Sequence, residues 1–348
     1  MQKALVLVGM LTCLDAGTAT LAVEATDSPV PQAKPSALVS AEDPGRLAVA
    51  LYQLAARGEA SDGTITSLCL HDDPYVRRAA VFALGTTGDA AHKALFARAA
   101  RDADPGVRRA AVFALTNLGG ADVVPLLETA LSDSHPSVRE LAATAMGRLG
   151  GELARQRLVA TLNDPSVRVR RAAVVALGDL GDSTVLDALR RLRDAPQRGI
   201  DTRRAALTRQ QLAGGHNFGY EFLTLPALMT RFSRETGIPT FVTDEALMAV
   251  ALAAEELQNL DSLKVSMWHV KASTFLDELT HAAGLAWLVE GRWVIVTLPA
   301  YLAYDTPLEL EIAGALHRLG DPSGRAVLRR YAKQRRWKAR AEALLGKD

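Results

Sequence analysis

One short motif recurs along this chain at a constant spacing. It reads DPYVRRAAVFALG from residue 73, DPGVRRAAVFAL from residue 104, HPSVRELAA from residue 135 and VRRAAVVALG from residue 169. Its valines stand at 76, 107, 138 and 169, so the step is 107 − 76 = 31, and the same step occurs twice more. A fixed period of this size is typical of stacked repeats, in which each unit contacts only its neighbours.

Each copy of the motif has the features of a helix start followed by an apolar helix face. In the first copy, Pro74 suits the first helical turn because its missing N–H has no partner to lose there, and Asp73 can cap the free amides. The apolar residues that follow Val76 recur at helical spacing, and a second amphipathic helix is expected over residues 91–99. One such hairpin cannot bury its apolar face alone, so the pattern predicts a mainly α fold, an α-solenoid of helical hairpins.

The recurring D-P-x-V-R-x-A-A-x-x-A-L-G pattern, followed by L-G-D or G-G, resembles short HEAT repeats of the kind found in phycobilisome-lyase-like proteins. The predicted solenoid extends over residues 41–215, with a degenerate first hairpin at 44–57 and 60–70 and a last Arg-rich helix that begins near residue 201. The resemblance implies that the Val-Arg helices line the concave side of the solenoid.

Residues 1–25 have the composition of a secretory signal peptide. Lys3 supplies a positive charge, and residues 4–14 form a short apolar run. The small residues of Val23-Glu24-Ala25 suit a cleavage site, and Gly17-Thr18-Ala19 is a second choice. Cys13 leaves a lipoprotein as an alternative, but Thr12 does not fit the usual lipobox. Residues 26–40 are expected to be a disordered Pro/Ala/Ser linker. These features predict a periplasmic or secreted protein with no transmembrane segment after cleavage.

Cleavage would leave Cys69 as the single cysteine of the chain, so no internal disulfide is expected. Cys69 stands between two leucines and is predicted to be a small core residue.

The 31-residue period breaks at residue 216, and residues 216–300 have a different pattern. Alternating or β-branched stretches predict strands at 220–225, 239–242, 265–270, 285–289 and 292–297. Between them, helices are expected over 226–236, 244–257 and 273–283. This order predicts a small α+β domain with a single sheet of three or four strands.

The segments LPALMTRFSRETGIP and TFLDELTHAAGLAWLVEGRWVIV resemble the short N-terminal (STN) domain of secretins and TonB-dependent transducers. Both have a helix, then T-G or A-G-L, then a strand. The resemblance covers about 80 residues and implies a periplasmic protein-docking module, which agrees with the predicted signal peptide.

The repeat pattern returns in residues 301–348. LELEIAGALHRLGD, from residue 308, matches a Val-Arg helix with its L-G-D exit, and another helix is expected from Trp337. We therefore predict that the α+β domain is inserted between two helices of the array, with Gly214-Gly215 and Pro299 marking the two junctions.

Two columns of arginine follow from the period. Arg77, Arg108, Arg139 and Arg170 form the first column and are predicted to pair with aspartates of neighbouring repeats, such as Asp73, Asp104 and Asp164. Arg78, Arg109 and Arg171 form the second column, which is a candidate partner-binding row together with Phe82 and Phe113. Binding of acidic peptides or phosphates by the first column, and core positions for the two phenylalanines, remain as alternatives.

Several cations gather near the C-terminus, and they could contact anionic lipid or nucleic acid or form a solvated end of the array. They are Arg325, Arg329, Arg330, Lys333, Arg335, Arg336, Lys338 and Arg340. Export argues against nucleic acid.

No sequence pattern of a metal, nucleotide or hydrolase site occurs, and the net charge is +1. We therefore expect no cofactor and no enzymatic activity. The predicted function is an exported scaffold that binds a protein of the cell envelope. The alternative is a lyase-like or enzyme-accessory protein that handles a chromophore or a modified protein.

Overall fold

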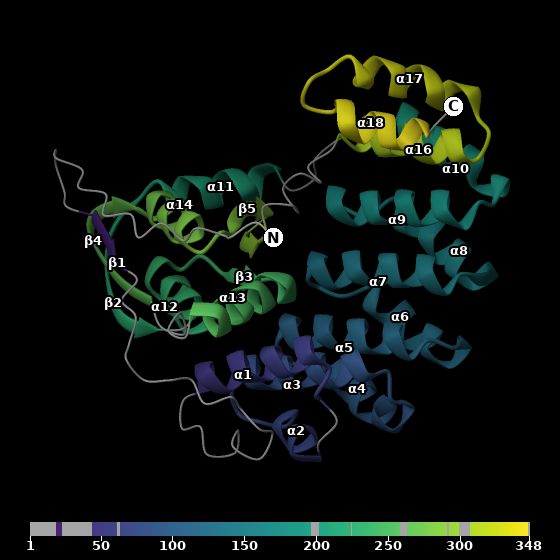
Figure 1. Cartoon of the computed structure of the whole chain (residues 1–348). Coiled ribbons are helices and arrows are strands. Elements are labelled where there is room, and N and C mark those ends of the chain that lie inside the picture. Colours follow the sequence, from purple (N-terminus) through teal and green to yellow (C-terminus); the bar gives the residue numbers. More distant parts are fainter. Residues whose placement is uncertain are drawn as a thin grey trace. The chain divides into compact units, whose positions relative to one another are not determined.

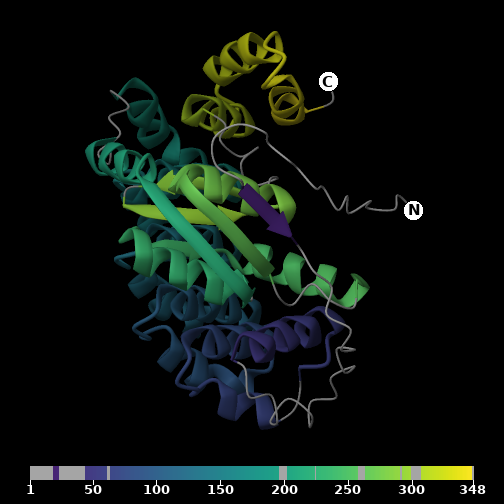
Figure 2. The same ribbon diagram turned by 90° about the vertical axis from the view of Figure 1, so that its left-hand side faces the viewer.

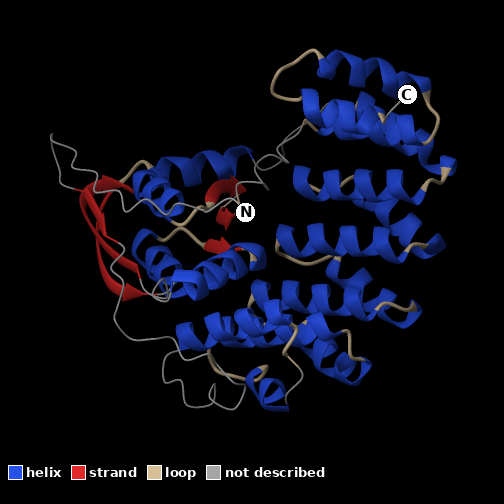
Figure 3. Ribbon diagram, viewed as in Figure 1, coloured by secondary structure: helices blue, strands red, loops and turns tan. Residues whose placement is uncertain are grey.

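The computed structural model describes residues 19–22, 44–60, 63–195, 202–223, 225–257, 263–290, 292–298 and 307–346. The fold is mainly α, an α-solenoid of HEAT-like hairpins with an inserted small α+β domain, as predicted (Figures 1 and 3). Its residues form two compact units, 1–87 with 202–302 and 88–201 with 303–348. The predicted linker at 26–40 lies outside the described residues, as do residues 1–18 of the predicted signal peptide.

The second unit consists of helical hairpins that contact one another in sequence. One row contains α5 (Pro105–Leu118), α7 (Pro136–Leu149), α9 (Val167–Leu180), α16 (Leu308–Arg318) and α18 (Lys338–Leu345). The helices that alternate with them are α4 (Lys93–Ala99), α6 (Val124–Ala130), α8 (Gly151–Thr161), α10 (Leu186–Asp194) and α17 (Pro322–Ala332). The motif valines Val107, Val138 and Val169 are buried, so the predicted apolar stripe is the face that packs.

Small residues at one repeat position allow the helices of the first row to approach closely. A Cβ atom at Gly147 of α7 would lie 2.5 Å from the Cβ atom of Ala176 in α9. Gly178 stands one period later (147 + 31 = 178), and a Cβ there would lie 2.9 Å from that of Ala315 in α16. The contact between α9 and α16 therefore repeats the contact between α7 and α9. Helix α16 therefore stacks on α9 as the next repeat would, although the inserted residues separate α10 from α16 in the sequence.

Polar contacts join the C-terminal helices to α10. Arg190 Nε donates to Asp321 Oδ2 over 2.7 Å, and Arg193 donates to the hydroxyl of Ser323 over 2.9 Å. Asp321 also caps α17 by accepting the amide of Ser323. The hydrogen bond from Ser323, helped by the Arg190 ion pair, lowers the pKa of Asp321 to about 2.

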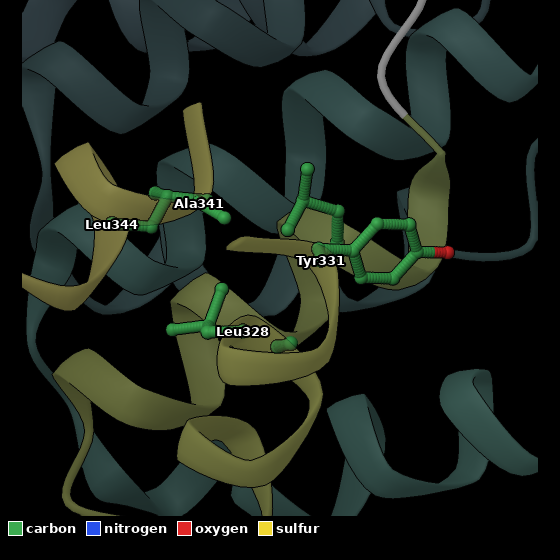
Figure 4. Close-up of a cluster of buried hydrophobic side chains, with 6 residues drawn as sticks. Leu328, Tyr331, Ala341 and Leu344 are labelled. Carbon is green, nitrogen blue, oxygen red and sulfur yellow. The ribbon is translucent and has the colours of Figure 1, made fainter. Parts of the chain in front are cut away.

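The last three helices, α16, α17 and α18, enclose a core of their own (Figure 4). It contains Leu310, Ala313, Leu328, Tyr331, Ala341 and Leu344, with Trp337 packed at its edge. Arg340 of α18 forms two hydrogen bonds, of 2.9 and 2.8 Å, with the buried carboxylate of Glu311 in α16. Residues 307–346 are thus continuous with the array and also packed among themselves.

The first unit combines the first helices of the array with the inserted domain. Helices α1 (Pro44–Arg57), α2 (Gly63–Leu68) and α3 (Pro74–Thr87) pack together. The inserted part contains α11 (Thr202–Leu212), β2 (Gly215–Leu223), α12 (Leu225–Thr236), β3 (Thr240–Val242), α13 (Asp244–Leu257), β4 (Leu263–Lys271), α14 (Ala272–Ala282), β5 (Ala286–Glu290) and β6 (Trp293–Thr297). Because α11 contacts α14 and β5, the Arg-rich helix assigned to the repeats packs with the inserted domain.

The prediction of a single sheet is wrong, because the strands form two three-stranded sheets. Their orders are β1-β4-β2 and β3-β6-β5, with β1 formed by Ala19–Ala22 (Figure 2). Helix α12 contacts β2 and β3, and α14 contacts β4 and β5, so each helix packs between the two sheets. The rings of Phe218, Phe232 and Phe275 meet there, with the centroids of Phe218 and Phe275 4.2 Å apart. Two sheets allow both sides of these helices to be buried.

We expect Gly178→Leu to destabilise the second unit by about 1–3 kcal/mol, because the new side chain has no room against Ala315. Thermal unfolding followed by circular dichroism measures the loss. Ala160→Leu, at an exposed position of α8, is the matched control and should leave the melting temperature nearly unchanged. Equal melting curves for the two variants would show that α9 and α16 do not pack closely.

We expect the ion pair of Asp321 to stabilise the fold at neutral pH. Since the pKa of Asp321 in the fold is about 2, below its ordinary value, this contribution is complete above pH 4 and is lost as the pH falls towards 2. Asp321→Asn should cost about 1–2 kcal/mol at pH 7, and the cost should shrink below pH 4. Asp187→Asn is the control, because Asp187 also bonds Arg190 but is exposed. A cost that does not change between pH 7 and pH 3 would contradict the assignment.

Candidate functional site

Two arginines of the first column, Arg108 and Arg139, each tie one hairpin to the next. Arg108 donates to the carboxylate of Asp133 over 2.6 and 2.8 Å, and Arg139 donates to that of Asp164 over 2.8 and 2.9 Å. Both are paired, two-point contacts of the kind that fixes guanidinium orientation. Arg108 and Arg139 of the first column therefore form ion pairs between repeats, as the sequence favoured.

The same arginines also hold the loops that precede their helices. Arg77, Arg108, Arg139 and Arg170 each donate through Nη1 to carbonyl oxygens five and six residues earlier in the chain. Arg77, for example, donates to the carbonyls of His71 and Asp72 over 2.9 Å. Carbonyls of the turns thereby obtain side-chain donors, and the same contacts recur in the four repeats.

Two of the aspartates predicted for this ladder have another role. Asp73 and Asp104 accept the first backbone amides of α3 and α5, so they are helix caps. The aspartate that pairs with Arg108 is Asp133, and the sequence analysis missed it. Its signal was present, because Asp102, Asp133 and Asp164 are spaced by the period, 133 − 102 = 31 and 164 − 133 = 31.

The ladder shifts the pKa of its carboxylate. Burial of Asp133 opposes ionisation, but the hydrogen bonds from Arg108 and from the amide of His135 outweigh it, so its pKa lies below the ordinary value. His135 next to it is buried, and that burial lowers its pKa to about 3. The imidazole is therefore neutral at physiological pH, and its Nδ1 accepts the amide of Ser137 at the start of α7.

Arg78 of the second column lies in the interior of the first unit. Its Nε donates to Asp244 Oδ1 over 2.5 Å, and the exposed fractions of the two side chains are 3% and 1%. The guanidinium also lies over the ring of Phe241, 5.1 Å from its centroid. Asp244 opens helix α13 of the inserted domain, so this ion pair joins the inserted domain to α3.

Helix α1 adds two further contacts to the same junction. The hydroxyl of Tyr52 donates to Asp244 Oδ1 over 2.9 Å, and Gln53 donates to the carbonyl of Ala251 in α13 over 3.0 Å. The Tyr52 ring also packs on that of Phe82, with centroids 5.4 Å apart. Two strong donors compensate the desolvation of the buried Asp244 carboxylate. Loss of one donor would leave that charge partly uncompensated, which destabilises the fold.

The prediction that Arg78 and Phe82 bind an external partner is therefore wrong. Both side chains are buried, and their surroundings are supplied by α1 and by the inserted domain. The sequence could not identify Asp244 or Tyr52 as their partners, because these residues lie 166 and 26 positions away from Arg78 (244 − 78 and 78 − 52) and carry no period.

The remaining candidates lie on the first row of the second unit. Arg109 is buried, whereas Phe113 and Arg171 are half-buried. The period places Thr144 and Val175 at positions equivalent to Phe113, and Glu140 at the position equivalent to Arg171 (171 − 31 = 140). Glu140 pairs with Arg168 over 2.9 Å. We call Phe113, Glu140, Thr144, Arg148, Arg168, Arg171 and Val175 the row surface, because their spacing of three or four residues places them on one side of α5, α7 and α9.

The C-terminal cations are divided between ion pairs and the solvent. Arg340 pairs with Glu311 and Arg330 with Glu309, and the guanidinium of Arg336 lies over the ring of Trp337. The side chains of Arg329, Lys333, Arg335 and Lys338 are exposed. The cluster is thus partly structural and partly a basic surface.

Within the described residues, no group of histidine, cysteine and acidic side chains has the arrangement of a metal site. The described helices also include none with the length and hydropathy needed to span a membrane. Cys69 is buried, and burial raises the pKa of its thiol to about 12, as expected of a core cysteine.

We expect a double-mutant cycle to reveal strong coupling between Arg78 and Asp244. Arg78→Met and Asp244→Leu should each cost about 3–5 kcal/mol, because each leaves a buried charge, while the double variant should cost clearly less than the sum. Unfolding can be followed by tryptophan fluorescence, since Trp268, Trp287 and Trp293 lie in the inserted domain. Additive effects would contradict the buried ion pair.

The exposed pair of Arg157 and Glu128 is the matched control for that cycle. Its coupling should stay below about 1 kcal/mol, as is usual for surface ion pairs.

Comparison with protein families matches residues 64–135 and 125–209 to HEAT repeats. Among solved structures, the chain is similar to Escherichia coli YibA, with 19% identity over 64% of this chain and 80% of that chain and a TM-score of 0.36. It is also similar to the complex of CpcE and CpcF of phycocyanin lyase from a Nostoc species, with 22% identity, 51% and 74% coverage and a TM-score of 0.32. No curated protein matches the chain. The match to HEAT repeats thus covers less than half of the chain, from α2 to the first part of α11.

Proposed function

We propose that this chain is an exported scaffold that binds a protein of the cell envelope through its HEAT repeats. The observation that carries the proposal is the regular spacing of the first row, where the Arg108 and Arg139 ion pairs fix one hairpin against the next. A rigid array holds its surface residues at constant distances, which suits recognition of an extended or helical protein surface.

The row surface has the mixed character of a protein-binding surface. It combines the half-buried Phe113 and Val175 with the charges of Arg171 and the Glu140–Arg168 pair. Aromatic and arginine side chains are enriched where protein interfaces bind most strongly. This surface replaces the predicted Arg78 and Phe82 pair as the candidate binding site.

The proposal of export is supported by the composition of residues 1–25, which combine a short basic start, an apolar run and a small-residue cleavage site. The partner is then expected in the periplasm or the cell envelope. In this reading the inserted domain supplies a second docking surface.

We expect a photo-crosslinking amino acid at positions 144 or 148 of α7 to capture one envelope protein, because both side chains are exposed on the row surface. Positions 153 and 156 of α8, also exposed, are the matched controls and should not capture that protein. Equal capture from α7 and α8, or capture of a small pigment in place of a protein, would contradict the scaffold.

Arg171→Glu should weaken binding of the captured protein about tenfold or more, because it reverses a charge within the proposed interface. Arg101→Glu at an exposed position outside the row surface is the control, and melting curves show whether each variant is folded. Mass spectrometry of the protein recovered from cell fractions tests export separately. An uncleaved chain in the cytoplasm would contradict export. It would not bear on the binding surface, which the crosslinks test.

A further inference from the structure

In the sheet of β1, β4 and β2, one edge of the central strand β4 is covered only by the short strand β1 (Figure 2). Strand β4 has nine residues, and β2 pairs along its other edge from Gly215 to Leu223. On the opposite edge of β4, the four residues of β1 pair antiparallel with Lys264–Met267. Among the described residues, this short pairing is all that covers that side of β4.

The residues of β1 belong to the segment predicted to be a signal peptide. Ala19–Ala22 lie before the first of the two expected cleavage sites, at residue 25, so cleavage there would remove β1. Strand β4 would then be an edge strand, with a row of backbone N–H and C=O groups lacking partners. Two strands, β4 and β2, would remain of this sheet, and a two-stranded sheet gains stability when a third strand is added.

We propose that, after removal of residues 1–25, this side of β4 binds an extended segment of a partner protein by antiparallel strand addition. The inference rests on the proposed export, because cleavage of the signal peptide is what uncovers the edge. Main-chain hydrogen bonds to an exposed sheet edge provide the affinity in this mode of recognition, and alternate side chains provide the specificity.

The register of β1 indicates which segment fits. Ala19 lies opposite Met267, and Phe218 of β2 also lies opposite Met267. Directly paired residues share one face of a sheet, so positions 19 and 21 of the added strand are on the face where Phe218 packs against Phe232 and Phe275. A partner segment should therefore carry apolar residues at two alternate positions, as Ala19 and Leu21 do in β1.

A synthetic peptide of residues 17–24, GTATLAVE, serves as the probe of the edge. We expect it to bind the chain that begins at residue 26 and to bind the full chain carrying Thr20→Pro and Leu21→Pro, in which β1 cannot pair. The unaltered full chain, whose edge is filled, should bind it at least about tenfold more weakly. Fluorescence anisotropy of the labelled peptide measures all three, and circular dichroism verifies folding.

Two N-methylated peptides give the sharper test. Successive N–H groups of a strand point to opposite sides, so only one of the amides of residues 20 and 21 faces β4. Methylation of that amide should weaken binding about tenfold or more, and methylation of the other should have little effect. Adhesion of an apolar peptide without strand pairing would be affected equally by both.

Three results would overturn the proposal. They are no binding to either open form at peptide concentrations up to about 1 mM, equal effects of the two methylations, and dimers of the chain beginning at residue 26 that exclude the peptide. The last result would assign the edge to a second copy. Because these measurements use purified protein, they are independent of the α7 crosslinks and of the cell fractionation that test the proposed function.

Discussion

The pairing of an arginine with the aspartate that precedes the next hairpin is the interaction on which the array depends. Arg108 binds Asp133, which lies 25 residues later in the chain, and its third nitrogen holds two carbonyls of the loop before its own helix. One side chain thus orders a turn and joins two repeats. Because Arg139 makes the same contacts with Asp164, the spacing between hairpins is repeated as well as their fold.

The neighbouring arginine column shows how a repeat position can acquire a different role. Arg78 has the same place in its repeat as Arg171, but its guanidinium is enclosed by Asp244 and Phe241 of the inserted domain. Burial of such a pair is costly, so it is tolerated where geometry supplies further hydrogen bonds, and here Tyr52 supplies one. The first repeats thereby bind the inserted domain through the groups that in later repeats belong to the row surface.

Local pattern was sufficient for much of this fold. The period placed the starts of α3, α5 and α7 at Pro74, Pro105 and Pro136, and alternation located the strands of residues 216–300. The sequence pattern did not reveal that the strands separate into two sheets. Strands of both sheets show the same alternation of apolar and polar residues, and the sheets differ only in the helix faces that they cover. Nor could it reveal that Asp244 binds Arg78, since a contact between distant segments without a shared period leaves no pattern in either.

The array tolerates a long interruption for a reason of polymer physics. Between Asp194 and Leu308 lie 308 − 194 − 1 = 113 residues, yet the entropy of closing a connection grows only with the logarithm of its length. Extending a turn of about four residues to this length costs about 3 kcal/mol, and a folded insertion costs less because its own ends are held in place. The close contact of Gly178 with Ala315 and the bond from Arg190 to Asp321 offset that cost. A repeat array can therefore acquire an inserted domain without losing the contact between the helices on either side of it.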